Sequence, residues 1–164
     1  MQVDQIKELY DYNNWANDRL WQAVTGLSVD QLTTNIHNGI GDILTTLLHM
    51  VNGVWTWCTR WEGGIVTHAL QADDFSTLPL IRIRWQEEEE HVQRFLEILH
   101  DEDLNQEIQY IRSATPGQVF TLPLWKTMFH LINHQTQHRS EIAMQLTILN
   151  QSPGELGMSN FFNR

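Results

Sequence analysis

Three of the eight histidines in this sequence of 164 residues share a spacing that suits metal binding. His130, His134 and His138 are each four residues apart in a segment with helical periodicity. Side chains at this spacing lie about one turn apart on one helical face, so neighbouring imidazoles can converge on one ion. His134 and His138 flank the apolar stripe of the segment, whereas His130 lies further round the helix. The pair His134 and His138 is therefore the first candidate for a metal site.

A third ligand is available in an earlier helical segment, where His49 lies. Helical periodicity places His49 on the polar face, away from the stripe that contains Leu44 and Trp55. This residue would hold an ion only if that face meets a pocket or a partner. Two histidines at helical spacing also arise by composition, so periodicity alone leaves an ordinary role open for all of them. Four others show no partner spacing and are expected to be ordinary: His37, His68, His91 and His100.

Other catalytic and metal motifs are incomplete or absent from the sequence. A di-iron carboxylate bundle needs two Glu-x-x-His motifs on facing helices, and residues 88–91 supply only one. No zinc-protease motif, phosphate-binding glycine loop or nucleophile elbow is found. The single cysteine, Cys58, excludes an internal disulfide and a cysteine-rich zinc site. Cys58 lies among aromatic residues and is expected to pack as a small apolar side chain.

The charge balance argues against nucleic acid as a partner. Twenty acidic residues stand against ten lysines and arginines, a formal charge of −10, and phosphate binding needs clustered cations. The acidic run 87–90 is interpreted as a solvated helix face. The sequence has no signal peptide and no apolar run of about 18 residues, so no membrane partner and a cytoplasmic location are expected.

Four long helical segments are expected to position the histidines. Apolar spacing, caps and glycine stops predict helices over residues 6–26, 42–62, 76–100 and 123–150, with Ser76 capping the third and Pro79 in its first turn. Ser28 and Gln31 form a predicted capping box for a short extra turn, and residues 33–41 read as a loop. Alternation on both sides of Pro116 and Gly117 predicts a small hairpin before the last helix.

These elements indicate an all-α four-helix bundle. No linker or internal repeat divides the chain, so residues 1–164 are expected to form a single domain. The connections between the first three helices are too long for tight antiparallel hairpins. At least one crossover connection is therefore expected.

Three segments resemble the DinB-like family of metal-dependent enzymes, also called the DinB/YfiT-like superfamily. The aromatic and Asn-rich YNNWANDRLW resembles the first helix of that family. The segment 47–64, LLHMVNGVWTWCTRWEGG, resembles its second helix, in which a histidine precedes tryptophans, a basic residue and glycine. The most specific likeness is LINHQTQHRSEIAMQLTILNQSP at 131–153, which resembles the family's Asn-His-x-x-x-His-Arg signature.

The resemblance implies an up-down-down-up bundle and a divalent metal bound by His49, His134 and His138. His130 falls outside the signature and is expected at the surface or beside a ligand. Many relatives have Gly and Gln after the signature arginine, whereas here Arg139 precedes Ser140 and Glu141. Glu141 could orient His138 or a bound water, with a solvated carboxylate as the alternative, and Arg139 is a second candidate to support the site.

Three imidazoles leave coordination positions open, as catalytic metal sites do. Zinc or nickel is expected, with iron, manganese or copper as alternatives. Families similar to this one include thiol-dependent S-transferases, which implies a metal-dependent enzyme that acts on a small molecule with a low-molecular-weight thiol, or a hydrolase that uses metal-bound water. Two alternatives stay open: a non-catalytic metal-binding or stress-response homodimer, and a helical dimer with incidental histidines. Three tryptophans are candidates for an apolar pocket or for the core: Trp55, Trp57 and Trp61.

Overall fold

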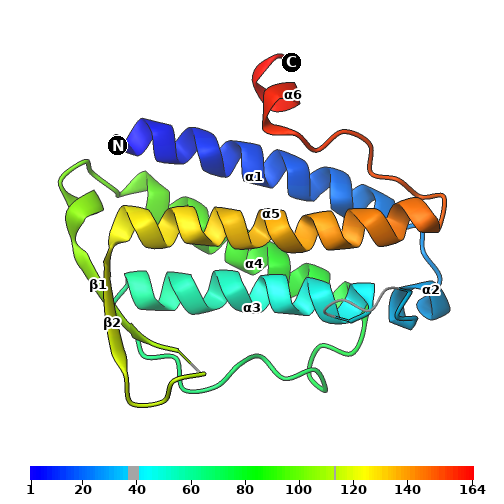
Figure 1. The fold of residues 1–164 in the computed structure, drawn as a ribbon, viewed down its shortest axis with the longest axis horizontal. Coiled ribbons are helices and arrows are strands. Elements are labelled where there is room, and N and C mark those ends of the chain that lie inside the picture. The colour runs from blue at the N-terminus through cyan, green and yellow to red at the C-terminus, as the bar shows by residue number, and fades with distance from the viewer. Residues whose placement is uncertain (37–40, 113) are drawn as a thin grey trace.

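Four long helices lie side by side along the molecule (Figure 1). The computed structural model describes residues 1–36, 41–112 and 114–164. Helices α1 and α5 run in one direction and α3 and α4 in the other, so the connectivity is up-down-down-up. Residues 62–77 return along the length of the bundle and form the predicted crossover. The helices are α1 (Val3–Val24), α3 (Ile43–Trp61), α4 (Leu78–Glu97) and α5 (Leu124–Ile148).

Most helix ends follow the predicted signals, and α4 is the exception. The Asp42 side chain accepts a hydrogen bond of 2.7 Å from the backbone N–H of Thr45 and begins α3. The prediction that Ser76 caps α4 is wrong, because Thr77 precedes the helix in extended conformation, with Pro79 in the first turn. Helix α4 also ends before His100, whose backbone N–H binds the Asp103 carboxylate in the following turn.

Shorter elements complete the fold. The Ser28–Gln31 capping box is confirmed at α2 (Val29–Thr33). The predicted hairpin is present as antiparallel β1 (Glu107–Ile111) and β2 (Val119–Pro123), with Tyr110 opposite Phe120. A 3-10 turn, η1 (Asp103–Asn105), and a C-terminal helix, α6 (Met158–Phe162), were not predicted. Residues 37–40, including His37 and part of the predicted loop, lie outside the described residues.

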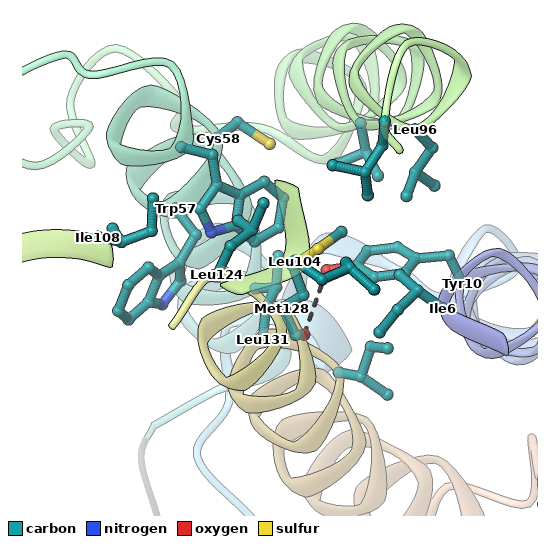
Figure 2. Packing of buried hydrophobic residues seen from close by; sticks show 14 of the residues in the cluster. Ile6, Tyr10, Trp57, Cys58, Leu96, Leu104, Ile108, Leu124, Met128 and Leu131 are labelled. Carbon is teal, nitrogen blue, oxygen red and sulfur yellow. Dashed lines mark hydrogen bonds between the residues drawn. The ribbon is translucent and has the colours of Figure 1, made fainter. Parts of the chain in front are cut away.

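The core consists of two large apolar clusters at opposite ends of the bundle and a small third cluster between α1 and α6. One cluster includes Ile6, Leu96 and Leu131, and in it the Tyr10 hydroxyl donates a hydrogen bond of 3.2 Å to the carbonyl of Met128 (Figure 2). The other is centred on aliphatic residues of α1, α3, α4 and α5. Between these two ends, α1, α4 and α5 contribute buried polar side chains: Asn13, Asn17, Glu88, Gln135, His138 and Arg139. The candidate metal residues belong to this polar middle layer.

The acidic run on α4 is only partly solvated. Glu88 is 4% exposed and forms ion pairs with Arg84 and His91. Glu89 accepts a hydrogen bond of 2.7 Å from the Trp85 indole, and burial raises the pKa of its carboxyl. The interpretation of 87–90 as one solvated face is therefore wrong for these two residues. Glu88 belongs to the buried face of α4, whose residues recur every three or four positions: Ile81, Trp85, Glu88, Val92 and Leu96.

None of the described helices is both long enough and apolar enough to cross a membrane.

Candidate metal centre

The structure brings together the three histidines that the family resemblance implied as ligands. His49 comes from α3, and His134 and His138 come from α5. The ring centroids are 4.9 Å apart for His49 and His134, 4.6 Å for His49 and His138, and 4.5 Å for His134 and His138. One ring nitrogen from each lies within 4.8 Å of the others. These three side chains therefore form a compact cluster with the donor atoms of a metal site.

Gly53 allows α3 and α5 to approach at this point. It lies one turn after His49 on the same face of α3. A Cβ atom at Gly53 would lie 2.8 Å from Cε1 and 3.0 Å from Nδ1 of His134. Only glycine leaves room for the imidazole in its present position. Sequence reasoning missed this residue, although a glycine inside a helix is costly and so points to a packing reason.

We expect Gly53→Ala to weaken metal binding roughly tenfold or more, because the added methyl group displaces the His134 ring from the cluster. The measurement is the metal dissociation constant from competition with a chromophoric chelator. Gly26→Ala is the matched control, since its added Cβ would meet only the Ala23 carbonyl oxygen at 3.9 Å. Equal affinities for wild type and Gly53→Ala would contradict this role.

A carboxylate fixes the orientation of His138. Its Nδ1 lies 2.8 Å from Oε2 of Glu141, which is three residues further along α5. The ionised carboxylate can only accept here, so Nδ1 carries a proton, and Nε2 is the nitrogen that the neutral ring would offer to a metal. Metal-bound histidines commonly have such a partner on the other ring nitrogen. The contact proposed between Glu141 and His138 is thus present in the structure.

The environment favours the neutral form of His134 and His49. Burial lowers the pKa of His134 to about 3, with further lowering by His138, His49 and His130. Burial and His138 also lower the pKa of His49, against a smaller opposite effect of Glu141. Neutral imidazole is the form that binds metal, so little proton release is needed. His49 is exposed whereas His138 is buried, which leaves the cluster accessible from one side. Three imidazole donors fit a divalent metal ion.

The lowered pKa of His134 predicts how the metal-free protein responds to acid. The unfolded chain binds a proton at His134 near the ordinary value of 6.5, whereas the folded chain does so only near 3. Stability is therefore lost as the pH falls from 6.5 towards 3. We expect the melting temperature of His134→Gln to fall less over this range than that of wild type. The exposed His100→Gln serves as control, and identical slopes for wild type and His134→Gln would contradict the prediction.

Arg139 does not face the histidine cluster. The residue is 1% exposed, and its guanidinium donates hydrogen bonds to Asn13 and Asn17 at 2.9 and 2.7 Å. It also donates to the hydroxyls of Tyr12 at 3.3 Å and Thr136 at 3.0 Å. The arginine of the third resembling segment thus binds the Asn-rich first segment. Its contacts tie α5 to α1 and support the bundle.

His130 lies beside the cluster and does not join it. Its ring centroid is 6.4 Å from that of His134 and 5.4 Å from that of Trp57. Burial lowers its pKa, with smaller effects in the same direction from Arg112 and Arg60. The two arginines therefore create a positive electrostatic environment around His130, next to the candidate metal centre.

A second group of donor atoms has a structural explanation. Cys58, Glu88 and His91 each offer an atom within 4.8 Å of the others. Both nitrogens of His91 already face carboxylates, Glu62 at 2.9 Å and Glu88 at 3.4 Å. Burial, then Glu88 and Glu62, raise the pKa of the Cys58 thiol. These contacts form an ion-pair network beside a packed, protonated thiol, as expected for a core cysteine.

A cleft leads from the cluster towards the hairpin. It has a volume of about 540 Å³ and is lined by Thr56, Trp57, Arg60, Tyr110, Arg112, Leu122, His130 and His134. Of the three tryptophans considered, Trp57 lines this cleft, Trp61 lies in the core, and Trp55 packs near His68. The two arginines were missed from the sequence. Arg60 could have been found, because it continues the helical face of His49, Gly53 and Thr56.

Comparison with known proteins agrees with this fold. A structure from Enterococcus faecalis, described as a conserved protein of locus, matches with a TM-score of 0.68 at 10% identity, over 89% of this chain and 96% of that one. A DinB-like protein from Bacillus cereus ATCC 10987 gives 0.67 at 14% identity, over 91% and 93%. A DinB family member from Shewanella denitrificans gives 0.60 at 18% identity, over 95% and 89%.

A comparison with curated proteins found no match. The sequence model of the DinB family matches residues 1–153, which is most of the chain and includes all three clustered histidines. The family resemblance seen in the sequence is therefore confirmed: the chain belongs to the DinB family.

Proposed function

We propose that this protein binds one divalent metal ion through His49, His134 and His138 and uses it in a reaction of a small molecule. The observation that carries the proposal is the convergence of three imidazoles beside a cleft. Within the described residues, no fourth His, Cys, Asp or Glu joins this group. Three protein ligands leave a position for substrate or water, which is typical of catalytic sites.

The bound ion would supply a lowered pKa for a coordinated water or thiol. The chain itself would hold the reactants. The hydrogen bond from His138 to Glu141 fixes one imidazole, and close contact with Gly53 fixes the His134 ring. Trp57 and Tyr110 give the cleft an aromatic wall against which an apolar substrate can pack.

The nucleophile of such a reaction would come from outside the chain. Cys58 is the one cysteine of the sequence, and its thiol is buried with a raised pKa. It can neither reach the cleft nor ionise readily. The resemblance to thiol-dependent S-transferases supports a low-molecular-weight thiol as the nucleophile, with a water molecule as the alternative. We therefore propose a thiol S-transferase, with hydrolysis as the second reaction to be assayed.

The test is a panel of electrophiles offered to the metal-loaded protein with glutathione, bacillithiol or mycothiol. We expect metal-dependent loss of one thiol above the uncatalysed rate, and no such loss with His134→Ala. Ester and amide substrates without thiol test for hydrolysis. Full metal loading without turnover in either assay would reject the enzyme and favour a non-catalytic metal-binding or stress-response module. A cytoplasmic location and a homodimer stay predictions.

A further inference from the structure

We propose that Arg60 and Arg112 form an anion-binding subsite that holds a carboxylate or phosphate group of the substrate in the cleft next to the three histidines. The proposal rests on the proposed function, because it names the chemical class of molecule for the same site. Both arginines and His134 line the one cleft of about 540 Å³. The two arginines also line an adjoining hollow of about 380 Å³ under the crossover segment.

The charge of this cleft is opposite to that of the protein. The chain has twice as many acidic residues as lysines and arginines and a formal charge of −10. Nevertheless, the residues described as lining the cleft and the adjoining hollow include two arginines and no Asp or Glu. In the described part of the chain, neither Arg60 nor Arg112 forms an ion pair with a carboxylate, whereas Arg84 and Arg94 pair with glutamates. A local positive field of this kind attracts organic anions.

Both guanidinium groups are held in place by groups other than acids. Arg60 donates a hydrogen bond of 2.9 Å to the Ile111 carbonyl, and its Cζ lies 4.9 Å from the ring centre of Trp57 and 5.3 Å from that of Tyr110. Arg112 lies 4.3 Å from the ring centre of Phe120. The Ile111 carbonyl and the rings of Trp57, Tyr110 and Phe120 are the groups that these two side chains contact. Most of their N–H groups are therefore left for a ligand. Arg60, which is half-buried and hydrogen-bonded, therefore loses little conformational entropy when it binds an anion, whereas the exposed Arg112 is restrained by ring contacts alone.

The spacing sets the shape of the ligand. Gly53 packs against His134, and Arg60 lies seven residues further along α3, roughly 10 Å along the helix axis. The long Arg60 side chain can bring its guanidinium closer to His134 than this separation along the helix axis. The substrate would thus carry its anionic group several bonds from the atom that reacts at the three histidines. The intervening part would lie against Trp57, Tyr110 and Leu122.

The experiment measures thiol binding to the Co²⁺-loaded protein by the thiolate-to-cobalt charge-transfer band. Mercaptocarboxylates of increasing length, from mercaptopropionate to mercaptooctanoate, are compared with the mercaptoalcohols of equal length. We expect the best acid to bind at least about tenfold more tightly than its alcohol. Arg112→Gln and Arg60→Gln should each remove most of this preference by weakening the binding of the acid, with a much smaller effect on the alcohol.

Controls separate the subsite from the fold and from the proposed function. Arg94→Gln removes the same charge on the exposed side of α4 and should keep the preference. Arg112→Gln tests the subsite while it keeps the hydrogen bond from Arg60 to the Ile111 carbonyl. Calorimetry with hexanoate and hexyl phosphate measures anion binding without a thiol, and binding of either that is lost in both variants supports the subsite.

The two proposals fail in different ways. Equal affinities for acids and alcohols in wild type, together with no arginine-dependent binding of hexanoate or hexyl phosphate, would overturn the subsite and leave thiol chemistry standing. Arginine-dependent binding of these anions without a charge-transfer band for any thiol would support the subsite and reject the thiol reaction.

Discussion

His134→Ala is expected to lower the metal affinity more than about 100-fold and to leave the purified protein without stoichiometric metal. His134 contacts both other histidines, with its Nε2 3.0 Å from Nε2 of His49 and its ring centroid 4.5 Å from that of His138. Its loss leaves two ligands on separate helices, which are too few for a stable site. The measurement is metal content by mass spectrometry, with calorimetry for affinity, on protein made without a histidine tag.

His130→Ala is the matched control for this substitution. It removes a histidine from the same helix, one turn away, whose ring is 6.4 Å from that of His134 and outside the cluster. This variant should keep wild-type metal content. If both variants lose metal equally, or if His134→Ala keeps it, the assignment of ligands is wrong.

Arg139→Met is expected to lower the free energy of unfolding by about 3 kcal/mol. The substitution keeps an apolar stem of similar length and removes the donors for Asn13 and Asn17. These side chains are 6% and 2% exposed, so water cannot readily replace the lost donors. Burial lowers the pKa of Arg139, yet no acid neutralises it among the described ion pairs, which makes its polar contacts the main compensation for burial.

Urea unfolding of the metal-free protein measures this effect without interference from metal binding. Arg94→Met is the control. Arg94 and its partner Glu90 are both exposed and 3.8 Å apart, so their ion pair contributes little to the free energy of unfolding. Equal midpoints for the two variants would show that the Arg139 network is not needed for stability. A folded Arg139→Met protein should still bind metal, since Arg139 makes no contact with the three histidines among its hydrogen bonds.

The sequence predicted the elements of the bundle because its signals are local. Asp42 begins α3, the Ser28–Gln31 box begins α2, and alternation around Gly117 gives the hairpin. Each depends on residues within one or two turns. The charge run on α4 misled for the opposite reason, since the burial of Glu88 depends on a distant part of the chain. Its carboxylate lies within 4.8 Å of the Cys58 sulfur of α3, and its neighbour His91 contacts Glu62 just after that helix.

The candidate site shows the same division. Helical spacing placed His134 beside His138, but it assigned His49 to a polar face, and only the family resemblance joined it to the pair. The structure reconciles both, since His49 is exposed and still faces α5 through the gap that Gly53 leaves. The approach of two helices that are far apart in the sequence cannot be calculated from the periodicity of either one. For the same reason, the sequence could not predict that Arg60 of α3 and Arg112 after β1 both lie near the Tyr110 ring.

The most direct test of the metal centre is an anomalous difference map from crystals of the zinc-loaded protein, recorded above and below the zinc absorption edge. We predict one dominant peak about 2.0–2.1 Å from a ring nitrogen of each of His49, His134 and His138. A dominant peak at Cys58, Glu88 and His91, or no peak at the three histidines in crystals of protein that carries one equivalent of zinc, would contradict the metal centre proposed for this DinB family protein.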